Sequence, residues 1–420
     1  MPTLAVVGLQ WGDEGKGKVV DLLASHAEII VRAQGGNNAG HSVIAEGKEY
    51  HFHLVPSGIL AQQTLCFLGG GVVIDPAALL NEIDRLEKQK ISLCQRLFIS
   101  PHAHVILPYH RQIDQQNEEV QAIGTTGKGI GPCYGDATER LGIRICDLMS
   151  PKVFENKLRE ILPIKNRILE KPFEIDAIIQ EYSEYAKKLK PFVKPIESHL
   201  HQEIIAGKKV LFEGAQGALL DILYGTYPYV TSSHTTSGGL ALGAGVGPQA
   251  IQQTLGVVKA YTTRVGHGPF PTEFNEDEAF LDPHVAREFG TTTGRQRRIG
   301  WFDTVMVAHA IRLSGVSSLA LTKIDILDTL PMIKICTGYR LDGHDLSEPP
   351  ACLEDLERVE PIYEQVEGWK SDTNKIKQLE EFPKNARLFL NKIESLLGIP
   401  IDLISFGPER EKTWKRKNFF

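Results

Sequence analysis

The amino-terminal stretch constrains the fold of this chain most strongly. Residues 3–9, TLAVVGL, form an unbroken apolar run of strand length, and residues 16–25 place Val19, Leu22 and Leu23 on one face of a helix. The glycine-rich segment GDEGKG lies between them. A strand, a glycine loop and a helix in this order are typical of the first unit of an α/β protein.

Further apolar runs continue this pattern along the chain. They read EIIVRA, TLCFLGGGVVI, RLFIS, KVLFEGA, GVVKAYTT and SLALTKID, and they lack apolar–polar alternation, so they suit strands buried on both faces of a parallel sheet. Apolar residues at helical spacing predict helices at 76–89, 153–162, 173–189, 302–313 and 374–381. The sequence therefore predicts an α/β fold with a large, mostly parallel central sheet flanked by helices.

Length and charge limit the organisation and the partners of the chain. The chain has 420 residues without a Ser-, Pro- or Gly-rich linker, so we expect one large domain over 1–420 with a helix-rich subdomain at about 150–207. The 46 basic and 52 acidic side chains leave a net charge of −6, which provides no global field for nucleic acid or an anionic membrane. Any anion must therefore be bound locally.

Cysteine usage and the amino terminus point to one compartment. The six cysteines form no C-x-x-C pair and no zinc spacing, so we interpret them as reduced thiols. Three H-x-H pairs, at 51/53, 102/104 and 199/201, lack further ligands at matching spacing, so ordinary histidines are favoured over zinc. There is no charged leader, no cleavage pattern and no apolar span of about 20 residues. We expect a soluble, cytoplasmic protein with no membrane partner.

A phosphate-binding loop follows the first apolar run. Residues 12–18, GDEGKGK, match the first seven positions of G-x-x-x-x-G-K-[ST], but Val19 replaces the hydroxyl residue that normally binds magnesium. Asp13 and Glu14 are unexpected in a loop that binds anions through backbone N–H groups. Asp13 is the candidate magnesium ligand, because Mg²⁺ prefers carboxylate and phosphate oxygens. A solvated glycine-rich turn is the alternative.

A second motif points to the base of the nucleotide. Residues 321–325, LTKID, follow an apolar run and resemble the guanine-reading motif of GTP-binding proteins. Asp325 would accept hydrogen bonds from two N–H donors of guanine, and Lys323 would cover the ring with its aliphatic stem. A capped strand end is the alternative, because four residues recur by chance. The two motifs together indicate GTP binding more strongly than either one alone.

Three more loops combine glycine with polar residues, at 35–42, 124–140 and 290–298. Glycine exposes backbone N–H groups, and threonine and arginine add donors suited to phosphate or carboxylate. His41 ends the first of these loops, and we favour a functional role for it over that of an ordinary hydrogen-bond partner. For the arginines of the third loop, a solvated surface loop is the main alternative. Nucleic-acid binding is less favoured, because no basic stripe is interleaved with aromatic residues.

In chain order, QWGDEGKGK, GGNNAGH, GTTGKGIGP, EGAQG, TYPYVTSS, TTGR and LTKID resemble the adenylosuccinate synthetase family over nearly the whole chain. The resemblance implies a P-loop NTPase-like GTP-binding core. It implies the ligation of IMP and L-aspartate to adenylosuccinate, the first committed step from IMP to AMP in purine nucleotide biosynthesis, with GTP hydrolysed to GDP and phosphate. It also implies a 6-phosphoryl-IMP intermediate, whose phosphate is a better leaving group than the carbonyl oxygen.

The resemblance also implies two catalytic residues, Asp13 and His41. Asp13 would take the proton from the ring nitrogen beside the 6-carbonyl, and the same carboxylate would bind Mg²⁺ together with the Gly40 carbonyl. His41 would stabilise charge on the transferring phosphoryl group or donate a proton, with Asp21 orienting its ring. One Mg²⁺ per subunit is expected, and GTP is the co-substrate.

The same resemblance implies three sets of binding residues and a homodimer. The GTP set is Gly12, Asp13, Glu14, Gly15, Lys16, Gly17, Lys18, Gly40, His41, Ser42, Arg297, Lys323, Ile324, Asp325, Ser405, Phe406 and Gly407. The IMP set is Asp13, Glu14, Gly15, Lys16, Asn38, Ala39, Gly40, His41, Thr126, Arg140, Gln216, Thr231 and Arg295. The aspartate set is Thr291, Thr292, Thr293, Gly294, Arg295, Gln296 and Arg297. Arg140 would reach into the neighbouring subunit's site, which predicts the dimer.

Departures from the family pattern are few. Phe406 stands where the family usually has a smaller residue, so the edge of the guanine pocket is expected to differ, and Lys128 and Gln296 replace commoner arginines, which should change affinity rather than reaction. The basic tail KTWKRKNFF has no counterpart, and we assign it no role. Two alternatives stay open: a regulatory GTPase or phosphotransferase acting on another small molecule, and a nucleotide-sensing module whose acids bind only metal.

Overall fold

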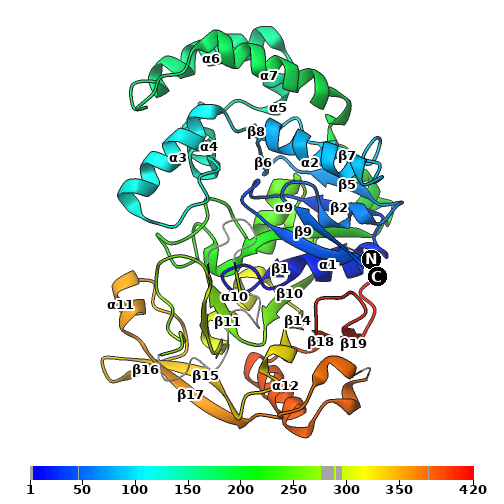
Figure 1. The fold of residues 1–420 in the computed structure, drawn as a ribbon, viewed down its shortest axis with the longest axis vertical. Helices are drawn as coiled ribbons and strands as arrows, with labels where there is room; N and C mark the ends of the chain where they lie inside the picture. The colour runs from blue at the N-terminus through cyan, green and yellow to red at the C-terminus, as the bar shows by residue number, and fades with distance from the viewer. Residues whose placement is uncertain (1–2, 46, 276–287, 290–295, 377) are drawn as a thin grey trace.

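A nine-stranded sheet forms the centre of the molecule (Figure 1). The computed structural model describes residues 3–45, 47–275, 288–289, 296–376 and 378–420. The strand order is β19-β18-β14-β10-β1-β9-β2-β5-β7, and among the described strands of this sheet only β19 runs antiparallel to its neighbour. The strands are β1 (Thr3–Gly8), β2 (Ile29–Arg32), β5 (Leu65–Leu68), β7 (Leu97–Ile99), β9 (Val210–Gly217), β10 (Gln253–Lys259), β14 (Ser318–Thr322), β18 (Ile401–Ser405) and β19 (Thr413–Lys415). The predicted α/β fold with a mostly parallel sheet is confirmed.

The first strand shows why these segments have no polar alternation. Ala5 and Val7 of β1 belong to one buried apolar cluster, whereas Leu4 and Val6 belong to a second one. Successive side chains of a strand point to opposite faces, so β1 separates two cores and must be apolar on both faces. Burying each such side chain contributes about 1.5–3 kcal/mol, which fixes the strand whose carboxyl end begins the phosphate loop.

Four of the five predicted helices are confirmed: α2 (Pro76–Lys88), α6 (Pro151–Lys165), α7 (Ile175–Leu189) and α10 (Thr304–Ser314). The helix predicted at 374–381 is wrong, because this stretch contains only the 3₁₀ turns η7 (Thr373–Lys375) and η8 (Leu379–Glu381). The α-helix of this region, α12 (Lys384–Leu397), begins after Pro383, and a residue that precedes proline, here Phe382, is driven to an extended backbone.

Seven further α-helices complete the described part of the fold. They are α1 (Lys16–Ala24), α3 (Pro108–Gln121), α4 (Ile130–Glu139), α5 (Ile145–Leu148), α8 (Ile196–Ile205), α9 (Ser237–Ala244) and α11 (Leu353–Arg358), with the 3₁₀ turns η1 (Ser57–Leu60), η2 (Lys190–Phe192), η3 (Ala218–Leu220), η4 (Pro248–Ala250) and η6 (Ile324–Leu327). The helices α6 and α7 lie at the top of Figure 1, within the predicted helix-rich stretch. Its division from the rest of one large domain stays a prediction. Among the described helices, none has both the length and the apolar character needed to cross a bilayer.

The structure also contains smaller sheets that were not predicted from the sequence. A four-stranded sheet contains β13 (Phe302–Asp303), β15 (Met332–Leu341), β16 (His344–Leu346) and β17 (Glu360–Glu367), and three strand pairs are β3 (His41–Ala45) with β4 (Lys48–Phe52), β6 (Val73–Ile74) with β8 (His104–Val105), and β11 (Thr262–Arg264) with β12 (Arg298–Gly300). Residues of β17 are half-buried or exposed, so this strand lacks the apolar run by which the central strands were found.

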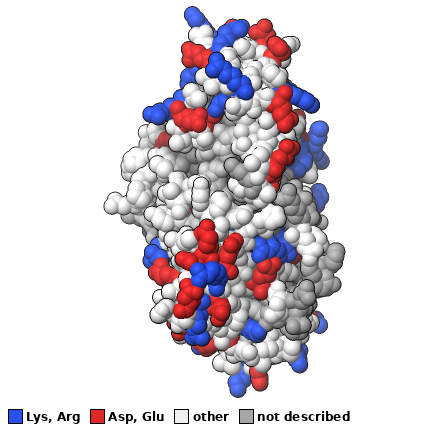
Figure 2. Space-filling view, turned by 90° about the vertical axis from the view of Figure 1, so that its left-hand side faces the viewer, with Lys and Arg blue, Asp and Glu red and all other residues white. Residues whose placement is uncertain are grey.

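The topology determines where a ligand can bind. The neighbours β9, β1, β10 and β14 are parallel, so their carboxyl ends meet at one edge of the sheet. Loops that follow parallel strands form the binding crevice of such folds. Acidic and basic side chains are interspersed on the face shown in Figure 2, which agrees with local rather than global binding of anions.

Candidate active site

A cleft of about 490 Å³ lies at this edge of the sheet. Its lining combines segments from the whole chain: residues after β1, β9 and β14, the loop before β3, and the loop between α3 and α4. The predicted site residues that line it are Gly12, Asp13, Gly15, Lys16, Gly17, Asn38, Ala39, Gly40, His41, Ser42, Thr126, Gln216, Thr231, Arg297 and Lys323. The structure therefore brings together residues predicted for all three substrates.

Other predicted residues lie elsewhere. Lys18, Asp325 and the stretch Ser405–Gly407 do not line the cleft, but Lys18 Nζ donates to Ser405 Oγ at 2.7 Å and to the Gly407 carbonyl at 2.8 Å, so they adjoin one another. Glu14, Arg140, Gln296, Ile324 and Phe406 also lie outside the lining. Predicted residues Thr291, Thr292, Thr293, Gly294 and Arg295 lie outside the described residues.

The phosphate loop has an unusual backbone. Gly12 and Gly15 have φ of 86° and 88°, a region that favours glycine, and Asp13 between them has φ of 58°. A non-glycine residue in this region costs of order 1–2 kcal/mol, and such residues concentrate at functional sites. The turn presents Asp13 to the cleft and starts α1 at Lys16.

Glu14 is an internal brace of this loop. Its buried carboxylate accepts hydrogen bonds from the backbone N–H groups of Gln10 and Gly12, each at 3.0 Å, and from Lys16 Nζ at 2.5 Å. A Cβ on Gly8 would lie 2.4 Å from the same carboxylate, so a larger residue there would displace the Glu14 side chain. The Glu14 carboxylate is thus paired within the loop, and the predicted contact of Glu14 with GTP and IMP stays a prediction that its backbone could fulfil. A carboxylate inside an anion-binding loop is accommodated because it is buried and fully paired.

Asp13, in contrast, faces the cleft. Its side chain is 30% exposed, and its Oδ2 accepts a hydrogen bond from Arg297 Nε at 2.8 Å. Gly40 lines the same cleft. One carboxylate with a backbone carbonyl suits Mg²⁺, which retains water and phosphate oxygens as its other ligands.

His41 is oriented by Glu213 and not by Asp21. Its Nδ1 lies 2.6 Å from Glu213 Oε1, and the Glu213 carboxylate also accepts hydrogen bonds from the Ser57 N–H and Oγ, each at 3.0 Å. Burial alone would raise the pKa of Glu213, but the His41 hydrogen bond, with the charges of His41 and Arg32, lowers the pKa below its usual value. A carboxylate on one ring nitrogen fixes the ring and its tautomer, leaving Nε2 for other partners.

The predicted role of Asp21 is therefore wrong. Its carboxylate accepts two hydrogen bonds from Arg410, at 2.7 and 2.6 Å, in bidentate geometry. Burial raises the pKa of Asp21, although Arg410 opposes the shift. Asp21 thus joins α1 to the carboxyl-terminal segment. Glu213 is the acid of EGAQG, a segment in which only Gln216 was predicted as a site residue.

The guanine-type motif begins where β14 ends. Thr322 Oγ1 donates to the Glu14 carbonyl at 2.6 Å, which ties the motif to the phosphate loop, and Lys323 follows with φ of 58°. Within the described residues, Asp325 Oδ1 is buried without a hydrogen-bond partner, and burial raises the pKa of this carboxyl. A buried acceptor in this condition suits a ligand that donates N–H groups. Phe406 is buried and packs edge-on against Phe382, with ring centroids 5.9 Å apart, so its ring is a core group.

Several lining residues were missed by the sequence analysis. The Arg264 guanidinium lies 5.0 Å from the Trp11 ring and 5.9 Å from the Tyr229 ring, and burial lowers its pKa to about 9. His267 also lines the cleft. The signal was TTRVGHG, a run of polar and glycine residues directly after an apolar strand.

The site combines a phosphate loop that carries a partly exposed carboxylate, a guanine-type motif and an oriented histidine, all at the edge of a parallel sheet. These features define a nucleotide-dependent enzyme of the α/β class. The family model for adenylosuccinate synthetase matches residues 5–414, so the chain belongs to the adenylosuccinate synthetase family. It is a GTP-dependent ligase of purine biosynthesis that forms adenylosuccinate from IMP and L-aspartate.

Individual members of this family match the chain over all or nearly all of its length. The chain is 51% identical over 428 residues to adenylosuccinate synthetase of Thermoanaerobacter sp. (strain X514), covering 100% of both chains. It is 50% identical to that of Heliobacterium modesticaldum (strain ATCC 51547 / Ice1), covering 98% of each. The fully ligated enzyme of Plasmodium falciparum is 36% identical with a TM-score of 0.95, covering 99% of this chain and 100% of that one. A cyanophage S-2L succinoaminodeoxyadenylate synthetase, 21% identical with a TM-score of 0.61 over 100% of this chain and 96% of that one, shares the fold.

Proposed function

We propose that the cleft performs the ligation in two steps that use Asp13 and His41. In the first step the Asp13 carboxylate removes the proton from N1 of IMP, and O6 attacks the γ-phosphorus of GTP. The bond to GDP breaks, which gives 6-phosphoryl-IMP. In the second step the aspartate nitrogen attacks C6, the C6–O bond breaks, phosphate leaves, and the nitrogen loses its protons.

The observation that carries this proposal is the contrast between two adjacent acids. The buried Glu14 carboxylate makes its hydrogen bonds within the loop. Asp13, in contrast, is partly exposed to the cleft and has a left-handed backbone conformation. A general base must reach its substrate, and of these two acids only Asp13 lines the cleft. His41, held by Glu213, is suited to donate to the transferring phosphoryl group through Nε2.

Magnesium belongs to this proposal. Asp13 and the Gly40 carbonyl would hold one Mg²⁺ per subunit, since both line the cleft and both offer the hard oxygen ligands that the ion prefers. When bound, the ion neutralises charge on the phosphate groups of GTP. Arg297 now occupies one side of the Asp13 carboxylate, so ligands must compete with or rearrange this pair.

The binding sets are proposals as well. Asn38, Thr126, Gln216 and Thr231 line the cleft and would bind IMP. For GTP we propose the phosphate loop with Lys323 and Asp325. The segment that ends at Arg297 would bind aspartate, because arginine matches carboxylates in bidentate geometry.

A homodimer follows if Arg140 serves a neighbouring site. Arg140 is exposed at the carboxyl end of α4, with φ of 66°, and it does not line the cleft of its own chain. Mixing Arg140→Leu chains with Asp13→Ala chains should restore activity in hybrid sites, whereas no rescue would refute a shared site. A cytoplasmic location stays a prediction.

Substrate dependence of phosphate release tests the function. We expect rapid release from GTP only when IMP and aspartate are both present, together with the purine absorbance change of adenylosuccinate. Release that proceeds equally without them would instead indicate a regulatory GTPase or another phosphotransferase.

A further inference from the structure

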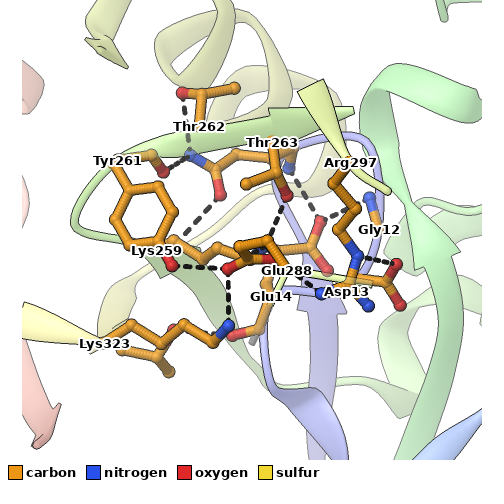
Figure 3. A network of polar contacts seen from close by, with 12 residues as sticks. Gly12, Asp13, Glu14, Lys259, Tyr261, Thr262, Thr263, Glu288, Arg297 and Lys323 are labelled. Carbon is orange, nitrogen blue, oxygen red and sulfur yellow. Dashed lines mark hydrogen bonds and ion pairs between the residues drawn. The ribbon is translucent and has the colours of Figure 1, made fainter. Parts of the chain in front are cut away.

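A buried cluster of charges joins the two sides of the cleft, and its centre is Glu288 (Figure 3). Its Oε1 lies 2.5 Å from Lys323 Nζ, and its Oε2 lies 2.5 Å from Arg297 Nη1 and 3.1 Å from Lys259 Nζ. The Tyr261 hydroxyl also donates to Oε1. One carboxylate thus contacts three cations that come from three different segments.

The partners of Glu288 belong to different parts of the proposed site. Lys323 is the lysine of the guanine-type motif, and Arg297 ends the proposed aspartate segment and contacts Asp13 Oδ2 at 2.8 Å. The Arg297 N–H donates to the Glu288 carbonyl at 3.0 Å, so backbone and side chain both hold this pair. Glu288 is therefore placed between the groups proposed for the base of GTP and those proposed for catalysis.

Electrostatics make such an anion necessary. Three cations so close together repel one another strongly in a buried site, and a shared carboxylate offsets that repulsion. Lys259 is fully buried, and burial lowers its pKa to about 7 although the Glu288 charge opposes the shift. Removing the carboxylate would leave Lys259 neutral or displaced, and Lys323 and Arg297 would move toward other partners.

We propose that Glu288 is a positioning residue that holds Lys323 and Arg297 at a fixed separation, so that GTP and aspartate bind to an assembled pair of cations. This inference rests on the proposed binding roles of Lys323 and Arg297. With Glu288 in place, Arg297 is shared between two carboxylates. Without it, Arg297 pairs with Asp13 alone, and Lys323 loses its anchor beside the guanine site.

The test measures KM for each substrate in Glu288→Gln. We expect KM for GTP and for aspartate to rise about tenfold or more, because a charge-assisted hydrogen bond to each cation is weakened, while KM for IMP changes less than about threefold. Glu288→Asp retains the charge and should recover part of both losses. Equal changes in all three KM values, or unchanged KM for GTP and aspartate in the folded variant, would overturn the proposal.

A matched control removes a neighbouring carboxylate. Glu273 holds Arg298, next to Arg297, through a 2.7 Å hydrogen bond to Nε and a second contact to Nη2, and neither residue lines the cleft. Glu273→Gln should leave all three KM values within about twofold. If the wild type and this control ligate normally but KM values in Glu288→Gln are unchanged, the inference is rejected while the proposed function stands. Loss of ligation in the wild type would reject the function itself.

A double variant separates positioning from simple charge balance. If Glu288 only neutralises buried Lys259, then Glu288→Gln combined with Lys259→Met should recover both thermal stability and wild-type KM values, which would overturn the proposal. Under the proposal, the double variant regains stability, but KM for GTP and aspartate stays raised about tenfold, because Arg297 and Lys323 still lack their shared partner. If Glu288→Gln alone fails to fold, the KM values of the double variant are compared directly with those of the wild type.

Discussion

The catalytic side, around His41, and the guanine side, around Asp325, differ in how completely a buried carboxylate is paired. The Glu213 carboxylate accepts hydrogen bonds from His41 and Ser57. On the guanine side, Asp325 Oδ1 is buried without a partner in the described part of the chain. His41 is therefore oriented before substrates bind, whereas the carboxylate proposed for base recognition requires the ligand to complete its hydrogen bonds.

The largest expected effect concerns the two adjacent acids. Asp13→Asn should lower kcat about a thousandfold with little loss of stability, because the variant loses a general base from a partly exposed position. Glu14→Gln should instead lower the free energy of unfolding by about 3 kcal/mol, because Lys16 loses a buried charged partner. Steady-state kinetics and urea unfolding of both variants measure the contrast. Equal kinetic losses without destabilisation in Glu14→Gln would refute the assignment of Glu14 as a brace.

The orientation of His41 gives the next effect. Glu213→Gln should lower kcat about a hundredfold, because an amide no longer fixes the ring and tautomer as a carboxylate does. Ser57→Ala, which removes one hydroxyl donor from the same carboxylate, is the milder control. A ring resonance of His41 that titrates identically in wild type and Glu213→Gln would contradict the pairing.

The guanine side is tested by a change of base. Asp325→Asn should raise KM for GTP about thirtyfold and favour xanthosine triphosphate, because the amide presents a donor where guanine needs an acceptor. Competition between the two nucleotides measures the preference. If GTP remains preferred as in the wild type, Asp325 does not read the base.

The smallest effect is a pH dependence from Lys18. Burial lowers the pKa of Lys18 from 10.5 to about 8, so the unfolded chain binds more protons between these values, and this group favours the folded state increasingly as pH rises through that range. The affinity for GTP should change in the opposite direction and fall as pH rises, because the phosphate groups of GTP are attracted by the protonated form of Lys18. KM for GTP should therefore rise about fivefold from pH 7 to 9. Lys18→Arg, which stays protonated, should flatten this profile.

The sequence predicted the features that local patterns determine. The buried strands, the phosphate loop and the guanine-type motif each occupy one continuous stretch, so apolar runs and glycine spacing revealed them. The helix expected at 374–381 failed because the position of Pro383 outweighed apolar spacing. Half-exposed β17 carried no apolar run at all.

Partnerships between distant residues could not be predicted. His41 and Glu213 are 172 positions apart, and Asp21 and Arg410 are 389 apart, so only the packed fold decides which carboxylate meets which cation. The same holds for Glu288, whose cations come from the ends of two strands and from a loop. The family resemblance implied Asp21 as the partner of His41, whereas the fold places Glu213 there.

The proposed chemistry depends most on O6 of IMP attacking the γ-phosphorus. IMP carrying ¹⁸O at the 6-position tests this directly, with mass analysis of the phosphate released during ligation. We expect one ¹⁸O atom in each phosphate, since the bond from phosphorus to O6 survives when the C6–O bond breaks. Unlabelled phosphate, with the ¹⁸O recovered in water, would contradict it.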